Sequence, residues 1–250
     1  MLVPELRQRV YKANMDLPVH GLVKFTWGNV SAIDREKGLI VIKPSGVPYE
    51  ELSPENMVVS DLEGNVVEGD LNPSSDLPTH VELYKAFAEV GGIVHTHSTE
   101  GVAWAQAGRD IPCYGTTHAD TFYGAIPCAR ALTPEEINGA YEKETGKVII
   151  EEFQKRSLDP MAVAGVTVRN HGPFSWGKDE QAAVYNAVVL EETARMARYT
   201  EGINPDVKEV PQALKDKHYL RKHGKMPITD KKSDTLNQCF YPIFTIEVTV

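Results

Sequence analysis

The sequence has few cysteines, no CxxC pair and no surplus of positive charge. Its three cysteines are Cys113, Cys128 and Cys239, and this sparse, odd set argues against a disulfide framework and against a thiolate zinc cluster. Lys and Arg number 26 against 35 Asp and Glu, which gives a net charge of −9. General nucleic-acid binders are usually basic, so that class is disfavoured, although a local basic pocket for a phosphate remains open.

Long apolar runs are also missing. A membrane-spanning helix needs about 18 or more consecutive apolar residues, and the sequence contains no such run. The first segment, MLVPELRQRV, is charged and lacks an apolar core, so no signal peptide is predicted. With 42% hydrophobic and 24% charged residues over 250 positions, the composition is that of an ordinary globular chain. These observations predict a cytoplasmic protein that does not enter a membrane.

Helical and strand patterns are mixed along the chain without a regular alternation. Apolar spacings of three and four residues predict helices over Leu2 to Leu17, Asp76 to Val90, 102–107, from Thr133 onward, and 179–200. Strands are predicted at 22–34, 39–43, GGIVHTH, VAGVTVRNHG and on both sides of a Gly64-Asn65 turn. The pattern predicts one three-layer α/β/α domain with a predominantly antiparallel or mixed central sheet.

His95-Thr96-His97 carries the strongest chemical signal. On a strand, residues two apart project from the same face, and two adjacent neutral imidazoles suit a cation such as zinc. His171 ends a second apolar segment, and Asp76 precedes a predicted helix. Three histidines and one carboxylate at the ends of elements predict a metal site open to substrate. The alternative interpretation is two hydrogen-bonded histidines at a strand end and a helix-capping aspartate.

A second group of residues suits an anion. Lys43-Pro44-Ser45-Gly46 combines a cation, a hydroxyl and a glycine that exposes backbone N–H groups, and Ser74 and Ser75 stand at the start of a helix. Asn29 lies in another glycine-bearing turn. Each of these is ordinary turn material when taken alone, but together they indicate a phosphate-binding cradle.

A polar cluster at 115–120, GTTHAD, follows an apolar run. This cluster is either a capped loop or a catalytic segment in which the Asp120 carboxylate transfers a proton beside a metal-activated substrate. Glu142 is a weaker candidate. His218, Arg221 and Lys222 are weaker still, because a solvated basic helix end explains them most simply.

Seven segments together resemble the L-ribulose-5-phosphate 4-epimerase branch of the class II aldolase/adducin family: TWGNVSAID, VIKPSG, PSSDLPTH, GGIVHTHS, GTTHAD, NHGPFSWG and KHYLRKHG. The resemblance covers residues 1 to about 224 and separates this domain from an atypical tail, 225–250. It implies a class II aldolase-like fold around an antiparallel-rich sheet. It also implies a homotetramer of four-fold symmetry with active sites between neighbouring subunits.

The resemblance also implies roles for individual residues. Zinc, or alternatively manganese or cobalt, would be held by Asp76, His95, His97 and His171. The phosphate of a sugar would be bound by Asn29, Lys43, Ser45, Gly46, Ser74 and Ser75. Aspartate at position 76 and the presence of Asp120 are typical of the epimerases rather than the aldolases. The implied reaction interconverts L-ribulose 5-phosphate and D-xylulose 5-phosphate by breaking and rejoining the C3–C4 bond, with Asp120 transferring a proton on one face of the aldehyde.

The end of the chain departs from the family pattern. In the family, a tyrosine shortly after the KHG segment serves the second aldehyde face, whereas here KMPITDKKSD follows Gly224 and the next tyrosine is Tyr241. This predicts intact metal and phosphate sites with impaired epimerase turnover. The alternation from Phe244 to Val250 predicts a terminal strand with an unpaired edge. The alternatives are a class II aldolase for another sugar phosphate, a non-catalytic adducin-like module and a metal hydrolase.

Overall fold

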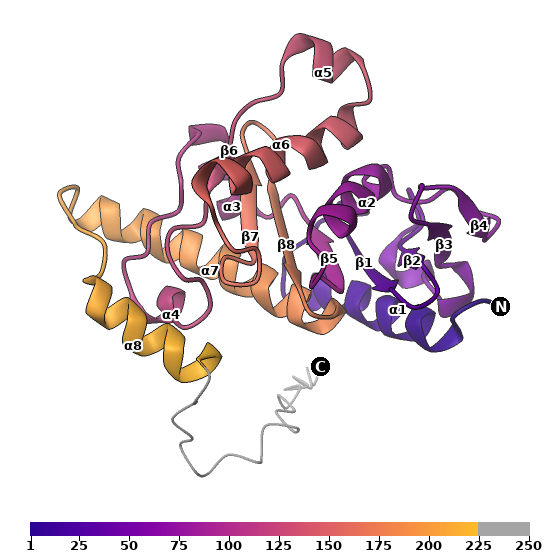
Figure 1. Ribbon diagram of the computed structural model, residues 1–250, viewed down its shortest axis with the longest axis horizontal. Coiled ribbons are helices and arrows are strands. Elements are labelled where there is room, and N and C mark those ends of the chain that lie inside the picture. The colour runs from indigo at the N-terminus through magenta and orange to yellow at the C-terminus, as the bar shows by residue number, and fades with distance from the viewer. Residues whose placement is uncertain (225–250) are drawn as a thin grey trace, which may run out of the picture.

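An eight-stranded sheet is the middle layer of the protein, whose computed structural model describes residues 1–224 (Figure 1). The strand order is β4-β3-β2-β1-β5-β8-β7-β6. The strands are β1 Asn29–Asp34, β2 Leu39–Ile42, β3 Val58–Asp61, β4 Val66–Glu68, β5 Gly92–His95, β6 Cys128–Ala129, β7 Gly165–Val168 and β8 Pro173–Gly177. Every neighbouring pair is antiparallel except β6 and β7, which are parallel. The predicted, predominantly antiparallel sheet is confirmed.

Helices cover both faces of this sheet. They are α1 Pro4–Val19, α2 Leu77–Ala86, α3 Thr99–Ala107, α4 Thr116–Ala119, α5 Pro134–Asn138, α6 Tyr141–Arg156, α7 Glu180–Ile203 and α8 Gln212–His223, with short 3-10 turns at Tyr49–Glu51 and Pro54–Asn56. Helix α1 and the first half of α7 pack on one face, and α2 and α6 lie on the other (Figure 1). The three predicted layers are therefore present. Among the helices of residues 1–224, none is both long and apolar enough to cross a membrane.

The alternation of side chains along the strands explains the two helical layers. In β1, Val30 and Ala32 join the core beneath α1, whereas Ser31 points to the opposite face and bonds His80 and Tyr84 of α2. Because successive residues of a strand face opposite sides, both faces of β1 are buried. The site described below therefore rests on a sheet that is packed from both sides.

The segment before β1 differs from the prediction. A strand was expected over 22–34, but β1 begins only at Asn29. Phe25 and Gly28 have positive φ values of 52° and 93°, and the Trp27 N–H donates to the Lys24 carbonyl, so residues 24–28 turn instead of extending. A Cβ at Gly28 would lie 2.9 Å from the His95 carbonyl oxygen. This loop is therefore held tightly against the end of β5.

Other element boundaries also differ from the expectations. Strand β5 ends at His95, so His97 lies beyond the strand, and α2 ends at Ala86 rather than Val90. Strand β8 had no predicted counterpart, the helix expected from Thr133 onward is divided into α5 and α6, and of α8 only a basic helix end was expected. The Gly64 hairpin and the Thr133 cap are confirmed: Gly64 has a φ of 88° between β3 and β4, and the Thr133 side chain accepts the Glu136 N–H. The expected terminal strand from Phe244 lies outside the described residues.

Candidate active site

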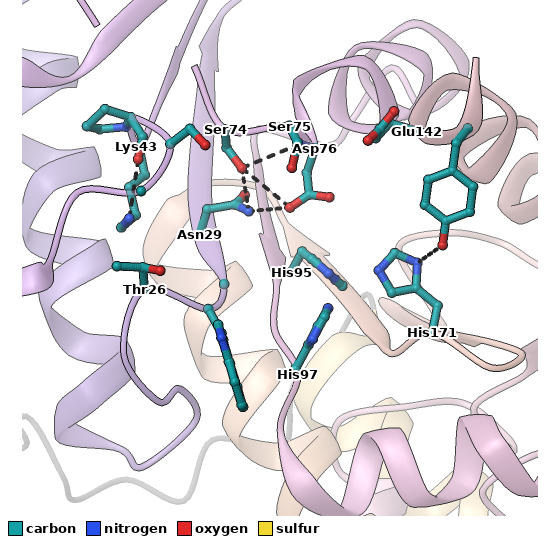
Figure 2. Close-up of a pocket in the computed structure, with 16 residues that line it drawn as sticks. Thr26, Asn29, Lys43, Ser74, Ser75, Asp76, His95, His97, Glu142 and His171 are labelled. Carbon is teal, nitrogen blue, oxygen red and sulfur yellow. Dashed lines mark hydrogen bonds between the residues drawn. The ribbon is translucent and has the colours of Figure 1, made fainter. Parts of the chain in front are cut away.

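A cavity of about 360 Å³ lies where β1 and β5 meet the beginnings of α2 and α6. Its walls bring together segments that are far apart in the sequence, and Figure 2 shows the side chains that line it. All the predicted phosphate-binding residues and all the predicted metal ligands line this cavity: Asn29, Lys43, Ser45, Gly46, Ser74, Ser75, Asp76, His95, His97 and His171. The volume lies within the usual range for small-molecule sites.

Two backbone segments form one end of the cavity. The Ser45 N–H donates to the Asn72 carbonyl, and the Ser74 N–H donates to the Lys43 carbonyl, each at 2.9 Å. These bonds hold the Lys43 and Ser74 segments side by side, so that their hydroxyls and glycine-bearing turn surround a common space. We refer to residues 43–46, 74 and 75 together with Asn29 as the phosphate cradle.

Lys43 gives the cradle its charge. Its side chain is buried, its Nζ donates to the Val47 carbonyl at 2.8 Å, and it lies 5.1 Å from the centre of the Tyr49 ring. Burial lowers the pKa of Lys43 to about 8, because a buried ammonium loses its hydration. The ammonium is still mostly protonated at pH 7, and an anion in the cavity would supply a countercharge that favours the protonated form further, so the cradle is electrostatically suited to a phosphate.

Three imidazoles lie beside the cradle. His95 comes from the end of β5, His97 from the loop that follows, and His171 from the turn between β7 and β8; one ligand atom of each lies within 4.8 Å of the other two. Their ring centres are 5.0, 4.8 and 5.4 Å apart. The expectation that both residues of the HTH segment lie on a strand was wrong for His97, but the loop after β5 still places its ring beside His95.

The chemistry of these histidines fits a divalent cation. His95 Nδ1 lies 2.9 Å from the Pro173 carbonyl oxygen, which can only accept, so Nδ1 carries the hydrogen and Nε2 keeps its lone pair. Burial lowers the pKa of His95 and of His171 to about 3, so both rings are neutral. Neutral imidazoles with free lone pairs facing one cavity are the donors that zinc and similar cations prefer.

Asp76 occupies the N-cap position of α2, but its side chain makes no capping hydrogen bond. Instead, Asp76 Oδ2 accepts a hydrogen bond of 2.7 Å from Asn29 Nδ2. The alternative interpretation of Asp76 as a helix cap is therefore wrong. The carboxylate lies in the cavity beside the histidines (Figure 2), and its role as a fourth ligand stays a prediction.

Two residues at the start of α6 complete the wall. Glu142, a weak candidate from sequence, lines the cavity, and so does Tyr141, which the sequence did not single out. The Tyr141 hydroxyl lies 3.3 Å from His171 Nδ1, and the Thr79 hydroxyl donates to the Glu142 carbonyl, which ties α6 to α2. In the sequence, the only indication that Tyr141 and Glu142 line the cavity is that they are polar residues at the start of an amphipathic segment, and this indication is weak.

Asp120 is not among these residues. It follows α4 and lines a different cavity, together with Lys222 and His223 of α8. Its carboxylate accepts a hydrogen bond of 2.9 Å from His218 Nδ1 and one of 3.1 Å from Arg221. His218, Arg221 and Lys222 lie in the second half of α8, at a basic helix end as expected, but solvation alone does not describe them, because all three side chains also contact Asp120.

The charge of Asp120 is set by these neighbours. Burial by itself would raise the pKa of Asp120, but the hydrogen bond from His218 and the charges of Lys222 and Arg221 outweigh burial and hold the pKa below its ordinary value. Asp120 is therefore a carboxylate at neutral pH. It does not share the cavity of the histidines, so the structure does not bring the predicted proton-transfer group to the predicted metal site.

Comparison with known proteins agrees with this architecture. The family model for the Class II Aldolase and Adducin N-terminal domain matches residues 8–198. The chain belongs to the class II aldolase and adducin family. Among curated members, it is 58% identical to L-ribulose-5-phosphate 4-epimerase UlaF of Salmonella paratyphi A (strain ATCC 9150 / SARB42) and to the UlaF of Salmonella typhi. Each match spans 220 residues, 88% of this chain and 96% of the relative.

Solved structures of class II aldolase type share the fold. An L-fuculose 1-phosphate aldolase is 24% identical with a TM-score of 0.71, covering 86% of this chain and 94% of that one. YgbL of Escherichia coli, described as a putative aldolase/epimerase/decarboxylase, is 22% identical with a TM-score of 0.68, covering 86% of this chain and 97% of that one. The expected class II aldolase-like fold is confirmed.

Proposed function

We propose that this protein is a metal-dependent L-ribulose-5-phosphate 4-epimerase that forms D-xylulose 5-phosphate. The observation that carries the proposal is the meeting of the phosphate cradle and the three histidines in one cavity, in a chain 58% identical to curated epimerases over 96% of their length. A non-catalytic adducin-like module would have no use for such a donor set, and a metal hydrolase would have no need of the cradle.

The cradle binds the phosphate of the sugar. Lys43 supplies the positive charge, and the hydroxyls of Ser45, Ser74 and Ser75 supply donors. With the phosphate fixed there, the sugar carbons extend toward the histidines. Anchoring by the phosphate also keeps the fragment that carries it in place after the C3–C4 bond breaks, so that it can turn and rejoin with the opposite configuration at C4.

His95, His97 and His171 would hold the metal, with Asp76 as the fourth ligand. Zinc fits this set, and manganese or cobalt are accepted by the same donors. When bound, such a cation supplies Lewis-acid stabilisation of the negative charge that develops on the sugar oxygens during C3–C4 cleavage.

Asp120 accepts the proton of the C4 hydroxyl, since its cationic neighbours keep it ionised. Its separate location in the protomer supports a homotetramer in which a neighbouring subunit brings Asp120 to the cavity. The second proton-transfer group was expected beyond Gly224, where Tyr241 lies outside the described residues. Reduced turnover therefore stays a prediction, as does a cytoplasmic location.

The test is a coupled assay in which purified, zinc-loaded protein receives L-ribulose 5-phosphate and D-xylulose 5-phosphate is followed. We expect turnover that is lost in His97→Asn. A folded, zinc-loaded tetramer without turnover would contradict the proposal. Release of dihydroxyacetone phosphate from a different ketose phosphate would favour an aldolase instead.

A further inference from the structure

Tyr141 occupies the wall of the cavity and has no role in the function proposed above. It is the first residue of α6, its side chain is half-buried, and it is the one tyrosine among the residues that line the cavity. Within residues 1–224, the hydrogen-bond partner of its hydroxyl is His171 Nδ1, at 3.3 Å. Figure 2 shows this contact as the dashed line at His171.

The direction of this hydrogen bond depends on which nitrogen of His171 carries the hydrogen. Nδ1 faces Tyr141, so Nε2 is the nitrogen left for a cation. An imidazole that binds a cation through Nε2 carries its hydrogen on Nδ1. His171 then donates and the Tyr141 oxygen accepts. A hydroxyl has one hydrogen, so within residues 1–224 the Tyr141 O–H is left without a protein acceptor and becomes available to a ligand.

The position of this hydroxyl decides which part of a ligand it meets. Figure 2 places Lys43 at one end of the cavity and His171 and Glu142 at the other, with His95 and His97 between them. A sugar phosphate whose phosphate group sits near Lys43 therefore presents its carbon chain, not its phosphate, to the end that holds Tyr141.

We propose that Tyr141 is a substrate-binding residue whose hydroxyl donates a hydrogen bond to a sugar oxygen, and that His171 fixes the direction of that bond. The sugar-phosphate ligand rests on the proposed function, whereas the link between Tyr141 and His171 does not. Two consequences follow together. Removing the hydroxyl takes away the acceptor for His171 Nδ1–H, which weakens cation binding, and it takes away a donor to the sugar, which weakens binding of the sugar moiety.

Tyr141→Phe separates these effects because it keeps the ring and removes one oxygen. Tyr199→Phe, at an exposed position on α7, is the matched control. Zinc affinity of the full chain is measured by competition with a chelator. Binding of L-arabinitol 5-phosphate, which lacks the reacting carbonyl, and of inorganic phosphate is measured by calorimetry on zinc-saturated protein.

For Tyr141→Phe we expect about tenfold weaker zinc binding, the lower end of the usual effect of losing a hydrogen-bond partner of a metal-bound histidine. We expect about tenfold weaker binding of L-arabinitol 5-phosphate, the value of one hydrogen bond of about 1.4 kcal/mol. Phosphate binding should be unchanged, and Tyr199→Phe should match the wild type in all three measurements.

Unchanged zinc affinity, or unchanged affinity for L-arabinitol 5-phosphate, overturns the proposal. An equal loss for inorganic phosphate also overturns it, because the substitution would then disturb the cradle rather than a sugar contact. None of these measurements needs turnover. A wild-type chain that shows the expected pattern but forms no D-xylulose 5-phosphate would contradict the proposed function and leave the role of Tyr141 standing.

Discussion

The side-chain amide of Asn29 donates to Asp76 at a distance of 2.7 Å. The same nitrogen donates to the Ser74 hydroxyl at 3.0 Å. Asn29 is buried, so it joins the phosphate cradle to the carboxylate that we expect to bind the metal. A residue first chosen as a phosphate ligand is thus, in this arrangement, a bridge between two halves of one site.

Replacing Asn29 with alanine should therefore weaken both halves. We expect zinc affinity to fall about tenfold, since Asp76 loses the donor that orients it, and phosphate affinity to fall several-fold because Ser74 loses its partner. Chelator competition and phosphate calorimetry measure the two effects, with Asn138→Ala on α5 as control. Loss of phosphate binding with full zinc affinity would show that Asn29 serves the cradle alone.

The burial of Lys43 predicts how the free energy of unfolding depends on pH. Burial lowers its pKa to about 8, below the ordinary value of about 10.4. Between these two values the unfolded chain binds more protons than the folded one, so the free energy of unfolding rises with pH and is lowest on the acidic side of the window.

Lys43→Met removes this cost of burying a charge. At pH 7 and without ligand, we expect the free energy of unfolding of the variant to be about 1–2 kcal/mol higher than that of the wild type. We expect its affinity for phosphate to fall roughly 100-fold or more. Denaturant unfolding and phosphate calorimetry check the two effects. Lys217→Met, at an exposed position on α8, should change neither. A destabilised Lys43→Met protein would mean that the ammonium contributes packing or hydrogen bonds that outweigh its desolvation.

The sequence predicted the parts of this site that are local and missed those that depend on tertiary contacts. Alternating and helical periodicities were enough for α1, β2, the Gly64 hairpin and α7, because each is encoded by neighbouring residues. The pairing of His95 with His97 was correct for a partly wrong reason, since β5 ends between them. Asp120 and His218 are 98 positions apart, and no spacing rule connects them.

The position of Tyr141 was also missed, because it depends on tertiary contacts. Its place beside His171 follows from the packing of α6 against α2 and the sheet, which no local pattern encodes. Residues 22–28 were misassigned because apolar and aromatic residues are typical of strands, whereas the positive φ values at Phe25 and Gly28 depend on contacts with the end of β5.

Two buried histidines outside the cluster of His95, His97 and His171 predict a loss of stability in acid. Burial lowers the pKa of His80 to about 3 and that of His118 to about 4, below the ordinary value of about 6.5. Below pH 6.5 the unfolded chain binds protons that the folded chain does not, so the free energy of unfolding falls as the pH falls through this window.

Each histidine should contribute about 2 kcal/mol of this loss between pH 7 and pH 5. His118→Gln, which can still donate to the Gly124 carbonyl as His118 does, should flatten the slope by that amount. Denaturant titrations at pH 5, 6 and 7 measure it, with the exposed His20→Gln as control. An unchanged slope would mean that His118 is protonated in the folded protein.

Replacing Arg221 tests whether Asp120 is the proton acceptor. Arg221 donates to Asp120 at 3.1 Å, and its charge helps to hold the pKa of that carboxyl down. Arg221→Gln should raise the pKa of Asp120, so the acidic limb of the pH profile of kcat/KM should move to higher pH while the plateau falls less than tenfold. Arg195→Gln on α7, which pairs with Glu192 at the surface, should leave the limb in place.

Asp120→Asn should abolish the same limb and reduce kcat at every pH by about 100-fold or more, the usual contribution of a general base. The two variants must agree for Asp120 to be the group that titrates. If Arg221→Gln lowers the plateau without moving the limb, then Arg221 contacts substrate or a neighbouring subunit directly and another group limits the reaction in acid. If the limb moves and Asp120→Asn removes it, the cations of α8 act through Asp120, and this cluster belongs to the catalytic site although it lies outside the cavity of its own protomer.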